Sequence, residues 1–328
     1  MNTESAPDFS DILDARDNLL GKAIRTPLLE NADLNRIAGG RVFIKPEVLQ
    51  HTGSFKFRGA YNFICRLNDE QKQRGLVSYS SGNHAQGVAY AAKLLGAKAT
   101  IIMPSDAPEI KINNTRGFGA EVILYNRFED DREAIGNRIM HESGALLIPP
   151  YDHPFIIAGQ GTCGLEIAEQ AKEIGVVLDG VVICCGGGGL TSGAALAIKE
   201  LSPTTQIYSA EPKGFDDTAK SLLKGHRVSV SPTARSICDA VLTPTPGEMT
   251  FSLNSQLVSK GLVVSDEEVR KAVKFAFNTL KLVVEPGGAV ALASVLQQRI
   301  ETKEKAIALT LSGGNVDPSR FLECLEVN

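Results

Sequence analysis

Short apolar segments alternate with longer, partly polar segments along most of the chain. The short segments are six or seven residues long and rich in Val, Ile, Leu and Ala. We predict strands from them at 41–47, 76–81, 98–103, 120–125, 145–150, 180–185, 205–211 and 306–312. Most are continuously apolar rather than alternating, which is typical of strands that are covered on both faces.

The intervening segments carry the signals of helices. We predict helices at 83–96, 127–144, 159–175, 190–201 and 266–281. Acidic residues open the second and the last of these, and glycines end the first three, as is usual at helix termini. Strands and helices that alternate over the whole length predict an α/β protein with mostly parallel sheets.

The chain is long enough for two domains. Its 328 residues exceed one ordinary domain and are few for three. Residues 76–150 make a compact series of strands and helices, and 151-YDHPF-155 marks its exit. We therefore predict a small domain at 71–151, inserted into a large domain formed by 1–70 and 152–328.

Composition and charge argue against several classes of function. The net charge is -4 and no run of basic residues suggests a track for a phosphate backbone, so we expect no nucleic-acid partner. The N-terminal segment is polar, and no apolar stretch approaches the ~20 residues that span a bilayer, so we expect a cytoplasmic protein without membrane contact. The six cysteines lack metal-ligand spacing and are expected to be reduced core thiols.

A glycine-rich turn, 186-GGGGLTSG-193, follows a predicted strand and opens a predicted helix. Without side chains, its backbone N–H groups can converge on a phosphate at the positive end of that helix. It lacks the Gly-Lys-Ser/Thr of a Walker A loop, and Thr191 or Ser192 stands where a dinucleotide fingerprint has its third glycine. One glycine would suffice for a tight turn, so four favour a cradle for a single phosphate.

Three further polar turns follow strands or open helices. The turn 80-SSGNHAQG-87 offers side chains that can bind a carboxylate or an aromatic hydroxyl: Ser80, Ser81, Asn83 and His84. Ser and Asn in this place are also ordinary helix caps, and the two roles are compatible. The other turns are 285-EPGGAVALAS-294 and 310-TLSGGNVD-317. Ligands of open α/β sheets bind beyond the carboxyl ends of the strands, so we expect these turns to converge on one crevice.

One lysine, Lys56, lies between two phenylalanines in 53-GSFKFRG-59. This segment alone favours a solvated lysine that points outward from the start of a helix. The alternative is an amine in a desolvated pocket, where a lowered pKa makes it a nucleophile. Together with a single-phosphate cradle and a carboxylate-binding turn, the alternative predicts pyridoxal phosphate (PLP) as the cofactor, because PLP needs a Schiff-base lysine and a phosphate site.

Eight motifs occur in order over nearly the whole chain: 25-RTPLL-29, 53-GSFKFRGA-60, 80-SSGNHAQG-87, 158-AGQGT-162, 186-GGGGL-190, 211-EP-212, 284-VEPGG-288 and 312-SGGNVD-317. In these motifs the chain resembles the fold-type II (tryptophan-synthase-like) PLP enzymes, and within them the serine/threonine dehydratase and serine racemase group. The resemblance implies two lobes, each with a mostly parallel twisted sheet flanked by helices, the smaller lobe being inserted in the larger.

The resemblance also implies roles for single residues. Lys56 would bind PLP covalently and abstract the α-proton of the substrate, Phe55 would pack on the cofactor ring, and Asn83 would hydrogen-bond its 3′-hydroxyl. Ser312 would face the ring nitrogen, and Glu285 is placed with the cofactor-binding residues. The phosphate would be bound by backbone amides of Gly186, Gly187, Gly188, Gly189 and Leu190. The substrate carboxylate would be held by Ser80, Ser81, Asn83 and His84.

The implied activity is that of an ammonia-lyase acting on L-threonine or L-serine, which yields a 2-oxo acid and ammonia. One alternative is an amino-acid racemase, in which Ser81 would exchange a proton on the face opposite Lys56. Another is the dehydration of 3-hydroxyaspartate, which the unusual segment 236-SICDAVLTPTPGE-248 permits. Arg132 would then pair with the second carboxylate, although it can equally pair with Glu129 in its own helix.

A divalent cation site is a weaker implication of the resemblance. Its ligands would be Glu211, the carbonyl of Phe215 and Asp217, whose hard oxygens suit Mg²⁺, Ca²⁺ or Mn²⁺. The alternative is a solvated acidic loop that caps a helix. Relatives are commonly oligomers, so a homodimer is expected. The chain ends soon after Asp317, so no feedback control by isoleucine is expected.

Overall fold

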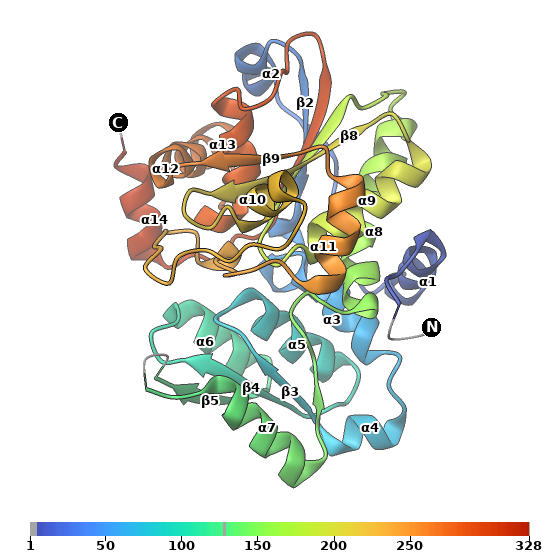
Figure 1. Cartoon of the computed structure of the whole chain (residues 1–328), viewed down its shortest axis with the longest axis vertical. Helices are drawn as coiled ribbons and strands as arrows, with labels where there is room; N and C mark the ends of the chain where they lie inside the picture. The colour runs from blue at the N-terminus through green and yellow to red at the C-terminus, as the bar shows by residue number, and fades with distance from the viewer. Residues whose placement is uncertain (1–4, 127–128, 328) are drawn as a thin grey trace.

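The computed structural model describes residues 5–126 and 129–327, which form two lobes, each built on one sheet (Figure 1). The sheet of the large lobe has the order β1-β2-β10-β7-β8-β9, and the sheet of the small lobe has the order β5-β4-β3-β6. The strands of the large lobe are β1 Leu29–Glu30, β2 Arg41–Pro46, β7 Gly180–Cys184, β8 Gln206–Pro212, β9 Lys260–Val264 and β10 Ala306–Leu311. Those of the small lobe are β3 Leu76–Tyr79, β4 Ala99–Pro104, β5 Glu121–Tyr125 and β6 Leu146–Leu147.

The order of the large sheet brings three distant parts of the chain together. Strand β10 lies between β2 and β7 and runs parallel to both, whereas β1 is antiparallel to β2. The carboxyl ends of β2, β10 and β7 therefore meet at one edge of the sheet. The segments that follow these strands lead to Lys56, Ser312 and the glycines 186–189. The topology alone thus places the predicted lysine next to the predicted phosphate loop.

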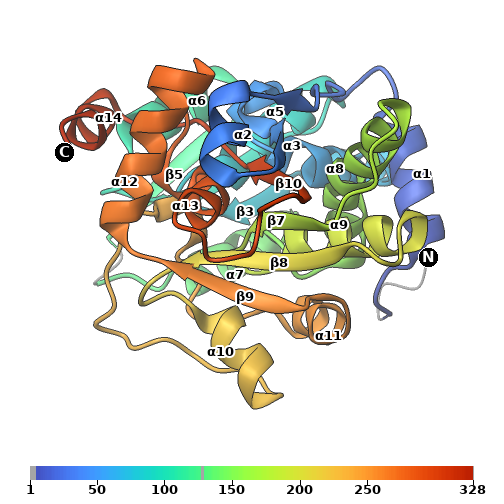
Figure 2. The ribbon, with the colours of Figure 1, turned by 90° about the horizontal axis from the view of Figure 1, so that it is seen from above.

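Helices cover both faces of the large sheet (Figures 1 and 2). The large lobe contains α1 Phe9–Leu19, α2 Ala32–Ala38, α8 Pro154–Glu173, α9 Gly189–Leu201, α10 Asp217–Lys224, α11 Glu248–Leu257, α12 Asp266–Phe275, α13 Val290–Leu296 and α14 Pro318–Leu325. Helix α3 Lys56–Ile64 lies at the junction of the lobes, packed against α8 of the large lobe and α5 of the small lobe. The small lobe contains α4 Asp69–Arg74, α5 Asn83–Leu94, α6 Glu109–Gly117 and α7 Arg132–Ser143.

The buried strands explain why the apolar segments are continuous. In β7, Val182 packs into a core with α2, α12 and α13, whereas its neighbours Val181 and Ile183 pack into a second core with α8 and α9. Successive side chains of a strand point to opposite faces, so a sheet covered on both sides needs an apolar residue at each position. The six cysteines are unpaired, and five of them are buried.

All eight predicted strands are confirmed, and two strands were missed. Strand β1 is only two residues long, and β9 begins with the poor strand formers Lys260 and Gly261. The helix predicted at 127–144 is α7, with residues 127–128 lying outside the described residues. The helix predicted at 266–281 is α12 followed by the π-helical segment η4, Ala276–Leu280.

The four strands of the small lobe come from residues 76–147, between β2 and β7 of the large lobe. This arrangement is the one that a small domain inserted into a large one would have. The exact domain boundaries, at residues 71 and 151, stay a prediction. Within the described residues, no helix combines the length and the apolar character that a membrane crossing needs.

Candidate active site

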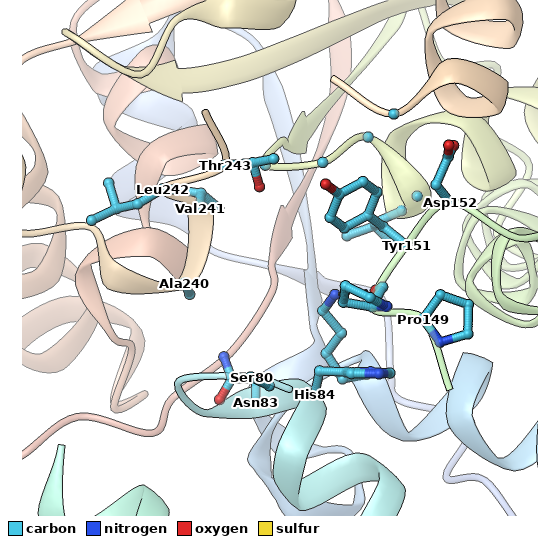
Figure 3. A pocket seen from close by; sticks show the side chains of 18 of the residues that line it. Ser80, Asn83, His84, Pro149, Tyr151, Asp152, Ala240, Val241, Leu242 and Thr243 are labelled. Carbon is cyan, nitrogen blue, oxygen red and sulfur yellow. Dashed lines mark hydrogen bonds between the residues drawn. The ribbon is translucent and has the colours of Figure 1, made fainter. Parts of the chain in front are cut away.

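A cavity of about 640 Å³ lies where the two lobes meet, beyond the ends of β2, β7 and β10. In Figure 3, Ser80, Asn83 and His84 of the small lobe lie on one side of it, and Ala240 to Thr243 of the large lobe lie on the other. Most of the predicted site residues line this cavity: Phe55, Lys56, Ser80, Ser81, Asn83, His84, Arg132, Gly186, Gly187, Gly188, Gly189, Leu190 and Ser312. The predicted cation ligands and Glu285 are not among the lining residues.

The glycine loop has a shape that only glycine allows. Gly188 has a φ of 94°, in the left-handed region. A Cβ atom on Gly187 would overlap the ring of Tyr151, and one on Gly188 would lie 2.9 Å from atoms of Thr250. The loop leads directly into α9, whose first amides have no intrahelical partners. These amides face a cavity at the positive end of a helix, which is an anion site.

Thr191 adds a side chain to this anion site. Its hydroxyl oxygen is buried and without a hydrogen-bond partner, apart from the weakly polar thiol of Cys185 nearby. Thr191 also lines the cavity. A buried hydroxyl group is normally hydrogen-bonded, so this one fits a phosphate oxygen bound in the loop.

Lys56 points into the cavity rather than into solvent. It is the first residue of α3, and its Nζ donates to the carbonyl of Pro150 at 2.6 Å and lies 5.3 Å from the ring centroid of Phe55. Burial lowers the pKa of Lys56 to about 8. Among the described residues, no ion pair holds its charge. The amine therefore loses its proton more easily than an ordinary lysine does, as a nucleophile or base requires.

A second lysine in the same cavity has the opposite electrostatics. Lys111 is buried and pairs with Glu285 at 2.9 Å and with Asp239 at 3.0 Å. Burial alone would lower the pKa of Lys111, but the two carboxylates outweigh it and hold that pKa above its ordinary value. Lys111 keeps its proton, so Lys56 is the lysine suited to the chemistry.

The turn before α5 leaves backbone amides free for a ligand. Gly82 is the N-cap of α5 and provides no side-chain cap, and the hydroxyl of Ser80 accepts from the amide of Gly82 at 3.1 Å. The first amides of α5 therefore have no intrahelical or side-chain partner, as a carboxylate site needs. His84 lies beside them, with Nε2 3.1 Å from the carbonyl of Ile148 and Nδ1 buried without a partner. Burial and the charge of Lys56 lower the pKa of His84 to about 3, so the ring is neutral.

Asn83 and Glu285 form one hydrogen-bonded unit. Nδ2 of Asn83 donates to Oε1 of Glu285, and Oδ1 of Asn83 accepts from Nδ2 of Asn315 at 2.9 Å. Glu285 thus does not line the cavity itself, and it contacts Asn83, which does. On the neighbouring wall, the backbone amide of Phe55 donates a hydrogen bond to the backbone carbonyl of Ser312 at 3.2 Å. Ser312 also lines the cavity.

Arg132 lies at the rim of the cavity, with its guanidinium carbon 5.3 Å from the ring centroid of Tyr79. No ion pair involves Arg132 within residues 5–126 and 129–327, so the helical pairing with Glu129 is not formed. A guanidinium stacked on an aromatic ring keeps its hydrogen-bond donors available in the ring plane. This geometry suits a carboxylate that enters the cavity.

The segment 239–248 forms the opposite wall, and Arg227 holds its end. Nε of Arg227 donates to the carbonyl of Pro246 at 2.8 Å, and its Nη1 pairs with Glu248 at 2.7 Å. Asp152 accepts from the amides of Glu248 and Thr250 at the start of α11. Pro244 and Pro246, together with these hydrogen bonds, restrict the conformation of this wall.

Several lining residues were not predicted as site residues, among them Tyr151, Asp152, Thr191, Lys111 and Asp239. Thr191 lies inside the quoted glycine-rich motif and Tyr151 directly follows the strand predicted at 145–150, so both had a signal in their position. Lys111 had no such signal. Asp239 lies in the unusual segment 236–248, but nothing around either residue indicated their pairing across 128 positions of sequence. In Figure 3 the hydroxyl of Tyr151 points toward Thr243.

The predicted cation ligands lie together near the end of β8. Glu211 accepts from the amides of Thr218 and Ala219 at 2.9 and 2.8 Å. Both carboxylate oxygens of Asp217 are buried without a hydrogen-bond partner, and burial raises the pKa of Asp217 to about 7. Burial and the charge of Asp217 raise the pKa of Glu211 well above its ordinary value. The buried, unsatisfied oxygens of Asp217 beside the buried Glu211 suit a cation better than they suit a solvated loop.

These oxygens are few for a cation. Within the described residues, no group of three or more His, Cys, Asp and Glu side chains could hold a metal ion. A cation here would therefore need the carbonyl of Phe215 and water as further ligands.

Comparison with known proteins agrees with this geometry. The family model "Pyridoxal-phosphate dependent enzyme" matches residues 19–313. An L-threo-3-hydroxyaspartate ammonia-lyase from Saccharomyces cerevisiae is 42% identical over 96% of this chain and 95% of its own length. A serine racemase from Schizosaccharomyces pombe is 42% identical over 97% of each chain. Among solved structures, maize serine racemase has a TM-score of 0.91 and 37% identity, covering 97% of this chain and 96% of its own.

Proposed function

We propose that this chain, which belongs to the family of pyridoxal-phosphate dependent enzymes, is an ammonia-lyase of β-hydroxy amino acids. L-threonine and L-serine are the substrates that the family resemblance implies. The observation that carries the proposal is Lys56, an amine with a pKa lowered to about 8, held between the glycine loop and the carboxylate-binding turn of the small lobe.

The residues of the cavity fit PLP. The amides of the glycine loop and the hydroxyl of Thr191 would hold its phosphate, Lys56 would bind it covalently, Asn83 would bind its 3′-hydroxyl, and Phe55 would pack against its ring. Ser312 would face its ring nitrogen. When bound, PLP withdraws electrons from the α-carbon of an amino acid, so that the α-proton becomes acidic.

The residues of the chain would divide the reaction among them. The free amides at the start of α5 would hold the substrate carboxylate, and neutral His84 would add no charge beside it. Nζ of Lys56 would take the proton from the α-carbon. The β-hydroxyl would then take up a proton and leave as water, and water would later release ammonia. The net products are one 2-oxo acid and one ammonia for each amino acid.

Arg132 favours a second candidate substrate, 3-hydroxyaspartate. Its guanidinium lies at the cavity rim on Tyr79 and has no carboxylate partner among the described residues. A substrate with a second carboxylate would supply one. Two of the similar proteins are L-threo-3-hydroxyaspartate ammonia-lyases, each more than 40% identical to this chain.

A substrate panel tests these proposals. L-threonine, L-serine and both diastereomers of 3-hydroxyaspartate are followed for 2-oxo acid and for inversion at the α-carbon. We expect 2-oxo acid as the main product. Inversion without 2-oxo acid would contradict the ammonia-lyase and favour the racemase, in which case Ser81→Ala should abolish inversion.

The role of Arg132 is tested with Arg132→Met and, as a control, with Arg138→Met, which changes an exposed arginine of the same helix. Loss of a charge-assisted hydrogen bond should raise the KM for 3-hydroxyaspartate roughly 10- to 100-fold. The KM for threonine should stay within about threefold of the wild type, since threonine has no second carboxylate to lose. Equal losses for both substrates would contradict the second candidate.

The unsatisfied oxygens of Asp217 support a cation site formed with Glu211 and the carbonyl of Phe215. Mg²⁺, Ca²⁺ and Mn²⁺ are the candidates, because each takes oxygen ligands. The homodimer and the cytoplasmic location stay predictions.

A further inference from the structure

A buried lysine joins the small lobe to two walls of the cavity in the large lobe. Lys111 lies on α6, and its side chain is only 1% exposed. Its Nζ donates to Oε2 of Glu285 at 2.9 Å and to Oδ2 of Asp239 at 3.0 Å. Both carboxylates belong to the large lobe. Each of the two bonds therefore crosses from one lobe to the other.

The Glu285 arm of this bridge ends at Asn83. The second oxygen of the same carboxylate, Oε1, accepts from Nδ2 of Asn83. Asn83 in turn accepts from Asn315, at 2.9 Å. Lys111 thus fixes the carboxylate that fixes the amide of Asn83. That amide is the group proposed to bind the 3′-hydroxyl of the cofactor.

The Asp239 arm ends at the substrate side of the cavity. Asp239 is the first residue of the 3₁₀ turn η3, Asp239–Val241, and the next residues line the cavity opposite the turn of the small lobe (Figure 3). Lys111 also lies against that turn, because a Cβ atom on Gly82 would overlap its side-chain carbons.

We propose that Lys111 is a positioning residue that couples the contact between the lobes to the cofactor site through Glu285 and to the substrate wall through Asp239. Its ammonium is committed to two carboxylates and does not act as a base. If the lobes separate, both bonds break, and Asn83 and the 239–241 turn lose their common support. The cavity is therefore fully assembled only when α6 lies against the large lobe. The proposal rests on the proposed function, since it concerns the ligands of the same cavity.

The test uses two variants that cut different arms of the bridge. Lys111→Met removes both bonds, whereas Asp239→Asn weakens one arm and leaves the pair of Lys111 with Glu285 intact. Lys98→Met, an exposed lysine of the small lobe, is the control. The dissociation constant for PLP, the KM and kcat for the amino acid, and the melting temperature are measured for each.

We expect Lys111→Met to weaken PLP binding on the order of 10- to 100-fold and to raise the KM, by analogy with the losses that follow when the hydrogen-bond partner of a metal ligand is removed. Asp239→Asn should raise the KM roughly 10-fold, because it acts on the substrate wall. Its affinity for PLP should stay within about twofold, since the Glu285 arm remains. Lys98→Met should match the wild type in every constant.

Two results would overturn the proposal. One is a Lys111→Met protein that loses only melting temperature and keeps its affinity for PLP and its KM, because a purely structural residue behaves in that way. If Lys111→Met does not fold, Asp239→Asn decides, and an unchanged KM overturns the proposal. A wild-type protein that takes up no PLP would contradict the proposed function as well. If the wild type binds PLP and Lys111→Met has the same PLP affinity and KM as the wild type, only this inference is contradicted.

Discussion

Replacing Lys56 by Met is expected to stabilise the cofactor-free protein at neutral pH and to lose that effect in alkaline solution. Burial holds the pKa of Lys56 at about 8, below the ordinary value of 10.5. Between these two values the unfolded chain binds a proton that the folded chain has released, so stability rises with pH. Below pH 8 the fold carries the full cost of a poorly solvated ammonium. The cost fades between pH 8 and 10.5.

The size of the effect follows from the two pKa values. A difference of about 2.5 units corresponds to about 3 kcal/mol, because one unit is worth about 1.4 kcal/mol. Met has a similar length and no charge, so the variant avoids this cost. It also loses the hydrogen bond to the carbonyl of Pro150, which is worth about 1–2 kcal/mol. The net expectation is a gain of about 1–2 kcal/mol at pH 6.5 and a loss of similar size near pH 10.5.

The assay is the free energy of unfolding by urea, measured on both proteins without cofactor from pH 6.5 to 10.5. Lys111→Met is the matched control, because Lys111 lies in the same cavity with its pKa raised. That variant leaves the buried carboxylate of Glu285 without its ion pair, so it should cost about 3–5 kcal/mol throughout this pH range. A Lys56→Met protein that differs from the wild type by the same amount at both ends of the range would refute the reasoning.

Two further predictions concern the phosphate loop and the cation site. Gly187→Ala places a methyl group into the ring of Tyr151, so PLP binding, followed by absorbance, should weaken at least about 10-fold, and an unchanged affinity would contradict the cradle. Ca²⁺ or Mg²⁺ should raise the melting temperature more at pH 8 than at pH 6, because the pKa of Asp217 is raised to about 7 and protons compete with the cation below it. Asp217→Asn should abolish this rise, and a variant that keeps it would place the cation elsewhere.

Much of the candidate site was predictable because its parts follow strands. The glycine loop, Ser312 and the turn at Ser80 each follow a predicted strand. Parallel pairing brings the first two to one edge of the large sheet, whereas the turn at Ser80 ends a strand of the small sheet. Local sequence therefore indicated both the chemistry and its place. Lys56 follows β2 by a longer segment, and its own surroundings in the sequence favoured a solvated lysine. Only the combination with the other turns indicated a buried amine.

The remaining residues of the site depend on how the lobes pack. Lys111 meets Glu285 across 174 positions of sequence, and nothing around either residue indicates the other. For Arg132 the sequence left Glu129 and a substrate carboxylate as possible partners, and the fold of the small lobe places it on Tyr79. Contacts of this kind arise from tertiary packing, which local patterns do not encode.

Reduction of the purified protein with borohydride, followed by mass analysis of its peptides, tests the central claim most directly. We predict a protein that absorbs violet light near the boundary between ultraviolet and visible light, loses this band on reduction, and carries the cofactor's mass on the peptide that contains Lys56. A colourless protein that takes up no PLP would contradict the account, and so would a label found on Lys111 instead of Lys56.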